Sequence, residues 1–150
     1  MEHDLILVRQ LPADPMKVWR CWTEADLLKR FFAPAPGETV EVVIDPVPGG
    51  RFYTLMRFEE HGDIGSECCI LVAEPGRRLV FTDALSEHFR PTGKPFFTAD
   101  ITFTARNGGC GYRVVARHAD PETARKHAEI GFEPGWGTVA EQLGALAATL

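Results

Sequence analysis

The sequence predicts a single α+β domain over residues 1–150, with a curved antiparallel sheet of about seven strands, two short helices and a long C-terminal helix. Three observations predict this class. Helix-start signals occur near both ends of the chain, apolar residues alternate with period two through the middle, and turn residues separate the alternating segments. A chain of 150 residues is long enough to bury one substantial core.

The N-terminal part predicts a strand followed by two short helices. Residues 3–11 are β-favourable and too short for a stable helix. Asp14 followed by Pro15 is typical of a helix start, because aspartate caps the helix and proline suits its first position. Thr23 to Asp26 resembles a capping box and predicts a second helix that ends near Arg30. The apolar stripe of the first helix is expected at Met16, Val18, Trp19 and Trp22.

The middle of the chain predicts six strands joined by turns. Gly, Pro and Asn-Gly signals separate the segments, and apolar residues alternate with polar ones within them. The expected strands are residues 38–45, 51–60, 65–74, 78–84, 96–105 and 110–118. The stretch 86–95, which holds two prolines and a glycine, is expected to form a longer loop.

The C-terminal part predicts a long helix that covers the sheet. Asp120 and Pro121 repeat the cap-and-proline signal. Apolar residues then recur at steps of three and four, which places Phe132, Trp136, Val139, Leu143, Leu146 and Leu150 on one helical face. Because Pro134 lacks a backbone donor and lies among glycines, we expect a kink or break near it.

Composition and charge narrow the class of partner. The net charge is -5 and the basic residues are scattered, so we expect no nucleic acid partner. No apolar stretch approaches the roughly 18 residues that a membrane span needs. The first residues lack the basic segment and cleavage site of a signal peptide, so we expect a cytoplasmic protein.

The sequence lacks the signatures of common metal and nucleophile sites. Its four cysteines, Cys21, Cys68, Cys69 and Cys110, form no paired CxxC pattern, and reduced thiols are the simplest interpretation. It contains no HExxH, no phosphate-binding GxxxxGK and no GxSxG. We therefore expect no metal and no cofactor.

Four short motifs follow one another along nearly the whole chain. They are Asp14-Pro-x-x-Val-Trp19 with Trp22-Thr23, Val47-Pro-Gly-Gly-x-Phe52, Glu74-Pro-Gly-x-Arg-Leu-Val-Phe-Thr82, and Gly135-Trp136. Together with the element order, they resemble the activator of Hsp90 ATPase family, within the START-like and Bet v 1-like (SRPBCC) superfamily. The sequence departs from that pattern at Phe31-Phe32, where Trp-Phe is common, and at Cys68, where a glycine is expected.

The resemblance implies a helix-grip fold, in which the C-terminal helix and the sheet enclose an apolar cavity. Whether this space is open or filled by the protein's own side chains stays open at this point. The aromatic residues of the inner face are suited to line a slot for an apolar ligand. The candidate ligand-binding residues are Phe52, Thr54, Met56, Phe58, Cys68, Phe81, His88, Phe97, Phe103, Tyr112, His118, Phe132, Trp136 and Val139.

Four of these candidates are polar: Thr54, His88, Tyr112 and His118. A small number of polar groups in an apolar pocket orients a ligand and supplies specificity. A histidine at a strand end, as His118 is expected to be, is more often hydrogen-bonded or exposed than an acid or base.

Three functions are compatible with these observations. The first is binding of an apolar or aromatic small molecule. The second is an enzyme of the same fold, of the cyclase, dehydratase or hydrolase type. It requires a titratable group, His88, His118, Asp83 or Asp100, to face the cavity. The third is a chaperone-associated interaction module. Stimulation of an Hsp90-type ATPase is not expected, because the chain lacks the N-terminal domain that accompanies this module in the chaperone activators. The sequence is also compatible with a homodimer.

Overall fold

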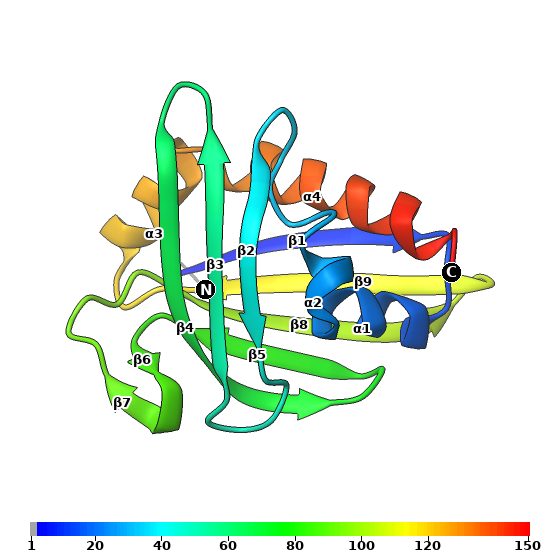
Figure 1. Ribbon diagram of the computed structural model, residues 1–150, viewed down its shortest axis with the longest axis horizontal. Coiled ribbons are helices and arrows are strands. Elements are labelled where there is room, and N and C mark those ends of the chain that lie inside the picture. The colour runs from blue at the N-terminus through cyan, green and yellow to red at the C-terminus, as the bar shows by residue number, and fades with distance from the viewer. Residues whose placement is uncertain (1–2) are drawn as a thin grey trace.

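The computed structural model describes residues 3–150, which form a seven-stranded antiparallel sheet with helices packed across one face (Figure 1). The strands of this sheet are β1 (Asp4–Leu11), β2 (Glu38–Ile44), β3 (Arg51–Phe58), β4 (Gly62–Glu74), β5 (Arg78–Thr82), β8 (Thr98–Arg106) and β9 (Gly109–Arg117). The helices are α1 (Pro15–Thr23), α2 (Ala25–Leu28), α3 (Pro121–Glu129) and α4 (Phe132–Ala147). The fold class predicted from the sequence is confirmed.

The order of strands across the sheet is β1-β9-β8-β5-β4-β3-β2. The first two strands of the chain therefore form the two opposite edges, and α1 and α2 make the connection between them (Figure 1). All other neighbours in the sheet from β2 to β9 are joined in chain order by hairpins or by the excursion between β5 and β8. This topology leaves one face of β3, β4 and β5 opposite α4.

The excursion between β5 and β8 differs from the plain loop expected over residues 86–95. It contains a small two-stranded ribbon, β6 (Leu85–Ser86) with β7 (Arg90–Pro91), joined by a 3-10 turn over Glu87–Phe89. The ribbon lies beyond the end of the main sheet (Figure 1).

The start of α1 agrees with the sequence prediction, and a second helix follows it as expected, but the expected cap of that second helix is wrong. The Asp14 carboxylate accepts a hydrogen bond from the Lys17 backbone N–H at 3.0 Å, as an N-cap should. Thr23 does not cap α2. It is the last residue of α1, and its hydroxyl donates to the Trp19 carbonyl at 2.8 Å. The residue before α2 is Glu24, which makes no side-chain cap hydrogen bond.

The C-terminal helix is interrupted, as expected, but at Gly131 rather than at Pro134. Gly131 has a φ of 109°, which favours glycine, and it separates α3 from α4. Pro134 lies in the first turn of α4, where a backbone N–H has no partner within the helix, so proline is tolerated there. The two helices therefore present their side chains to the sheet independently.

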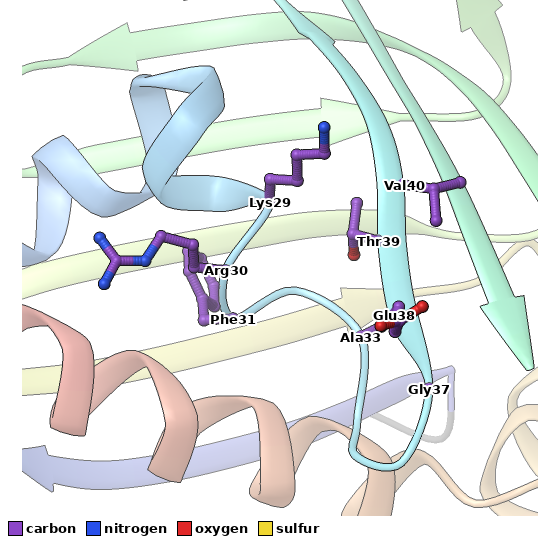
Figure 2. Close-up of a pocket in the computed structure, with 8 residues that line it drawn as sticks. All are labelled: Lys29, Arg30, Phe31, Ala33, Gly37, Glu38, Thr39 and Val40. Carbon is purple, nitrogen blue, oxygen red and sulfur yellow. The ribbon is translucent and has the colours of Figure 1, made fainter.

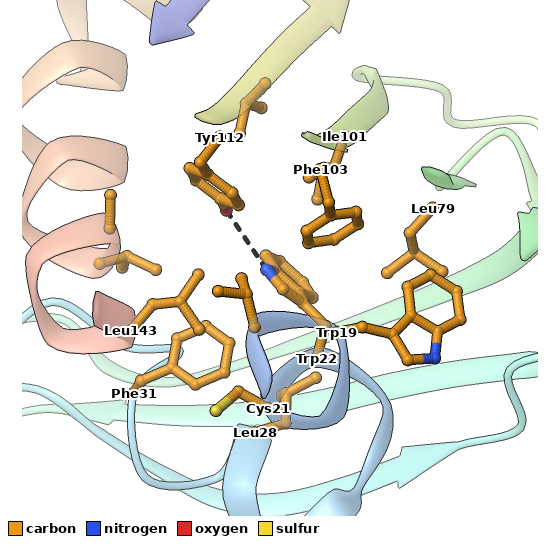
Figure 3. Close-up of a cluster of buried hydrophobic side chains, with 14 of the residues drawn as sticks. Trp19, Cys21, Trp22, Leu28, Phe31, Leu79, Ile101, Phe103, Tyr112 and Leu143 are labelled. Atoms are coloured by element: carbon orange, nitrogen blue, oxygen red, sulfur yellow. Dashed lines mark hydrogen bonds between the residues drawn. The ribbon is translucent and has the colours of Figure 1, made fainter. Parts of the chain in front are cut away.

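The core gathers around Trp22, which is fully buried (Figure 3). Its indole Nε1 donates to the Tyr112 hydroxyl at 3.3 Å, which links α1 to the centre of β9. Leu143 of α4 and Phe31 belong to the same buried cluster. One continuous core thus joins the N-terminal helices, the sheet and α4.

A second link between the N-terminal helices and α4 is polar. Gln142 donates from Nε2 to the carbonyls of Phe31 and Ala33, both at 2.8 Å, and its Oε1 accepts from the Ala35 N–H at 2.9 Å. This side chain satisfies three backbone groups of the segment between α2 and β2. We call it the Gln142 clamp.

Removing the Gln142 clamp is expected to destabilise the fold. Gln142→Ala leaves partly buried backbone groups unpaired, so the free energy of unfolding should fall by about 1–3 kcal/mol in urea denaturation. Gln142→Glu is the matched variant, because its carboxylate accepts from Ala35 but has no proton to donate to the two carbonyls. An unchanged free energy of unfolding in Gln142→Ala would show that water replaces the clamp without loss.

Candidate functional site

A pocket of about 340 Å³ lies between α4 and the face of the sheet that α4 covers. Its wall is mostly aromatic and aliphatic. The lining residues are Phe32, Pro34, Phe52, Thr54, Met56, Phe58, Ile64, Ser66, Cys68, Phe81, Phe97, His127, Ile130, Gly131, Phe132, Gly135, Trp136 and Val139.

The sheet side of the wall follows from the register of β3 and β4. Residues directly opposite each other in this antiparallel pair share a face, and every second pair faces the pocket. The pairs that line it are Phe52 with Cys68, Thr54 with Ser66, and Met56 with Ile64. Phe81 of β5 continues the surface, with its ring centroid 4.8 Å from that of Phe52.

The helix side of the wall comes from one face of α4 and the end of α3. Phe132, Trp136 and Val139 follow at helical spacing, and the rings of the first two lie 6.1 Å apart. His127 comes from α3 and reaches the same space because the chain turns at Gly131.

Trp22 packs directly beneath the rings that form the floor of the pocket. This residue does not line the space, but its ring contacts four rings that do. The centroid distances are 5.4 Å to Phe32, 6.5 Å to Phe52, 6.0 Å to Phe81 and 6.3 Å to Trp136. Trp22 therefore separates the pocket from the rest of the core.

The mouth of the pocket lies between the β3–β4 hairpin and the junction of α3 with α4. Ile64 is 42% exposed and Ile130 is 69% exposed, although both are large apolar residues that line the pocket. Exposed apolar side chains around a concave site are typical of the entrance to an apolar pocket.

The structure brings most of the sequence-predicted site residues together. Those that line the pocket are Phe52, Thr54, Met56, Phe58, Cys68, Phe81, Phe97, Phe132, Trp136 and Val139. Four others lie elsewhere: His88, Phe103, Tyr112 and His118. The candidates that alternate along β3 therefore line the pocket, whereas three of the four polar candidates lie outside it.

The position of each of the four candidates outside the pocket has a physical reason. The His88 side chain is 85% exposed, in the 3-10 turn beyond the sheet. Phe103 and Tyr112 point to the correct face but lie under α1, where Phe103 packs edge-on against Trp19 at 5.7 Å. His118 is buried behind His127 and does not reach the pocket.

Sequence reasoning missed several wall residues. Ser66 and Ile64 are found by counting back in steps of two from Cys68, once the register with β3 is known. His127 gave no such signal, because the helix break at Gly131 changes the phase of the helical pattern between α3 and α4. Phe32 belongs to the Phe31-Phe32 departure from the family pattern, and Phe31 itself is buried in the core.

The main polar feature of the wall is His127, which is paired with the buried His118 behind it. His127 Nδ1 lies 2.8 Å from His118 Nε2, and His118 Nδ1 lies 2.7 Å from the His3 backbone carbonyl. Burial, followed by the neighbouring His118, lowers the pKa of His127 to about 4. His127 is therefore neutral at neutral pH.

The carboxylates considered as possible bases are engaged by other groups. Burial raises the pKa of Asp83, although its carboxylate accepts from the Phe96 and Phe97 N–H groups at 2.7 and 3.2 Å. Burial also disfavours charge on Asp100, but hydrogen bonds from Arg78 and Arg117 outweigh it and hold the pKa of this carboxyl below its usual range. Neither carboxylate lines the pocket.

The four cysteine thiols are all buried and unbonded to one another. Cys68 is the one that lines the pocket, and burial raises the pKa of its thiol to about 12, so it is protonated at neutral pH. Within residues 3–150, no three His, Cys, Asp or Glu side chains gather as a group that would hold a metal ion. None of the helices in the described part of the chain is long and apolar enough to cross a membrane.

A second depression of about 470 Å³ lies between the end of α2 and β2 (Figure 2). It is bordered by the charged residues Lys29, Arg30 and Glu38, and Phe31 is its only aromatic residue. The Arg30 side chain is directed away from β2 (Figure 2). This mixed and exposed surface lacks the continuous apolar wall of the first pocket.

The lowered pKa of His127 predicts acid lability. Its pKa is about 4 in the folded protein, whereas an unfolded histidine titrates near 6.5. Between these values the unfolded chain binds a proton that the folded protein does not, so stability falls as the pH falls from about 6.5 to about 4. His127→Asn should reduce this dependence in urea denaturation at about pH 7 and about pH 4.5.

The control for this prediction is substitution of the exposed His61 by Gln, which removes an imidazole that does not line the pocket. If His127→Asn and the wild type lost stability equally on acidification, His127 would not be the group responsible.

Comparisons with known proteins agree with this architecture. A model of the family described as "Activator of Hsp90 ATPase homolog 1-like protein" matches residues 12–148. No curated protein matches the chain. A solved structure from Nitrosomonas europaea is 36% identical, covers 99% of this chain and 96% of its own, and superposes with a TM-score of 0.95.

Two more distant structures share the fold. A protein from Rhodobacter sphaeroides is 21% identical, with a TM-score of 0.85 over 100% of this chain and 95% of its own. A protein of the same activator-homolog type from Aeromonas hydrophila is 17% identical, with a TM-score of 0.71 over 97% and 92% of the two chains. With the family match over residues 12–148, these findings show that the chain belongs to the activator of Hsp90 ATPase homolog 1-like family.

Proposed function

We propose that this protein binds a small apolar or aromatic molecule in the pocket between α4 and the sheet. The observation that carries the proposal is the pocket itself, about 340 Å³ of space walled by apolar side chains. Ligand pockets in proteins typically measure about 300–1,000 Å³, so this one suits a small ligand.

The composition of the wall supports an aromatic ligand. The rings of Phe32, Phe52, Phe81, Phe97, Phe132 and Trp136 surround the space. Most of their mutual contacts are edge-to-face, for example Phe52 with Phe81 at 82° and Phe97 with Trp136 at 85°. A ligand ring entering among them finds both ring faces and ring edges, which are the two surfaces that aromatic pairs combine.

The state of the titratable groups favours binding over catalysis. A general base works best when its pKa lies near the operating pH, and that of His127 is about 4. The Cys68 thiol stays protonated, and Asp83 and Asp100 are engaged outside the pocket. The wall thus supplies shape and apolar surface more readily than an acid, a base or a nucleophile.

Gly135 offers a way to fill the pocket without disturbing the fold. It lines the space from α4, and a Cβ added there meets no atom within 4 Å. Replacing a helical glycine with another residue also favours the helix, by up to about 1 kcal/mol for alanine.

We expect Gly135→Leu to weaken the binding of naphthalene by at least about tenfold, because its side chain occupies part of a small cavity. Gly135→Ala is the matched control and should bind nearly as well as the wild type. Tryptophan fluorescence titration is the measurement, with Trp136 in the wall as the reporter. If Gly135→Leu and Gly135→Ala bound naphthalene equally, or if the wild type did not bind it, the proposed site would be wrong.

A further inference from the structure

We propose that His127 is the hydrogen-bond acceptor that orients the ligand, and that the ligand is an apolar or aromatic molecule carrying a hydroxyl or another neutral donor. This inference rests on the proposed function of the pocket and adds the chemical class of the ligand.

The first step is to place the protons on the two histidines. A backbone carbonyl only accepts hydrogen bonds, so the 2.7 Å contact with the His3 carbonyl requires a proton on His118 Nδ1. In neutral His118, Nε2 then carries the lone pair and accepts from His127 Nδ1 at 2.8 Å. Neutral His127 therefore carries its one ring proton on Nδ1. Its Nε2 holds a lone pair and can accept a hydrogen bond.

The second step is to locate that acceptor. His127 lines the pocket and is only 6% exposed, and Nε2 bonds to no group in residues 3–150. Thr39 Oγ1 is the single polar side-chain atom in this part of the chain that is both enclosed and without a partner. His127 Nε2 is thus unpaired but not enclosed, and its residue lines the pocket, so it is an acceptor within reach of a bound molecule.

The third step concerns the surroundings of the ring. The centroids of Phe96, Phe97 and Phe132 lie 4.8, 5.0 and 5.2 Å from that of His127. These rings keep water away from the imidazole, and an acceptor that water reaches poorly gains more from a ligand donor than an exposed one does.

The fourth step is the charge of the ligand. Burial keeps His127 neutral, so its lone pair would face any carboxylate or phosphate without a proton to offer. No arginine or lysine lines the pocket. The site therefore disfavours anions and favours neutral donors such as phenols and alcohols.

Two other residues of the wall, Thr54 and Ser66, also carry hydroxyl groups. The Ser66 hydroxyl is already paired with the Cys68 thiol at 3.5 Å, so Thr54 is the hydroxyl whose role must be separated from that of His127. Thr54 is 2% exposed, lines the pocket from β3, and its hydroxyl bonds to no other side chain or backbone group among the described residues. A hydroxyl both donates and accepts, so Thr54 alone would not discriminate strongly between a ligand hydroxyl and its methyl ether.

The experiment compares naphthalene, 2-naphthol, 2-methoxynaphthalene and 2-naphthoate by isothermal titration at about pH 8, above the ordinary imidazole pKa of about 6.5. The wild type should bind 2-naphthol roughly 2- to 10-fold more tightly than 2-methoxynaphthalene, which is the gain expected from one hydrogen bond. It should bind 2-naphthoate more weakly than naphthalene.

Two variants assign the preference to a residue. His127→Asn keeps an amide N–H at the level of Nδ1, able to donate to His118, but has no atom at the position of Nε2. It should still bind naphthalene and lose the preference for 2-naphthol. Thr54→Val removes the Thr54 hydroxyl at nearly constant volume and should keep that preference. Thermal denaturation checks that both variants are folded.

The possible outcomes separate this inference from the proposed function. If the wild type bound naphthalene but did not prefer 2-naphthol to its methyl ether, the role of His127 would be wrong and the binding function would stand. If the preference disappeared in Thr54→Val and persisted in His127→Asn, the orienting group would be Thr54 and the inference would be overturned. If none of the four compounds bound, both the function and the inference would fail.

Discussion

The structure depends on the way Trp22 is held at the meeting point of the helices and the sheet. Its Nε1 donates to the buried Tyr112 hydroxyl at 3.3 Å, and burial raises the pKa of that hydroxyl, so it stays protonated. A buried indole N–H needs such a partner, because leaving it unpaired costs about 1–3 kcal/mol. The bond fixes the ring plane, and the fixed ring supports the floor of the pocket.

This arrangement explains why the pocket stays distinct from the core. Below Trp22, the space between the sheet and the helices is filled by buried side chains such as Ile101, Phe103 and Leu143 (Figure 3). Above it, the rings of Phe32, Phe52, Phe81 and Trp136 pack on Trp22 and edge-on against one another, and they complete the wall. The Gln142 clamp holds the same helix against the segment before β2.

Much of the fold could be predicted from the sequence, because its signals are local. Asp14 and Asp120 cap their helices as the cap-and-proline pattern indicates. The alternation in β3 also predicts which residues face the pocket, since a strand repeats every two residues.

The parts that could not be predicted depend on hydrogen bonds and backbone angles that the sequence pattern does not specify. Thr23 was expected to start α2, but its hydroxyl bonds back to Trp19 and ends α1 instead. His127 reaches the pocket only because Gly131, with its φ of 109°, redirects the chain between α3 and α4. No pattern within α3 alone reveals that turn or the partner His118.

The central claim is that the space between α4 and the sheet is a ligand site, and nuclear Overhauser effects from a bound ligand test it most directly. In a complex with 2-naphthol, the account predicts contacts from the ligand ring to the methyl groups of Met56 and Val139, which line the pocket. Contacts confined to exposed methyl groups on β1, such as those of Ile6 and Val8, would contradict it.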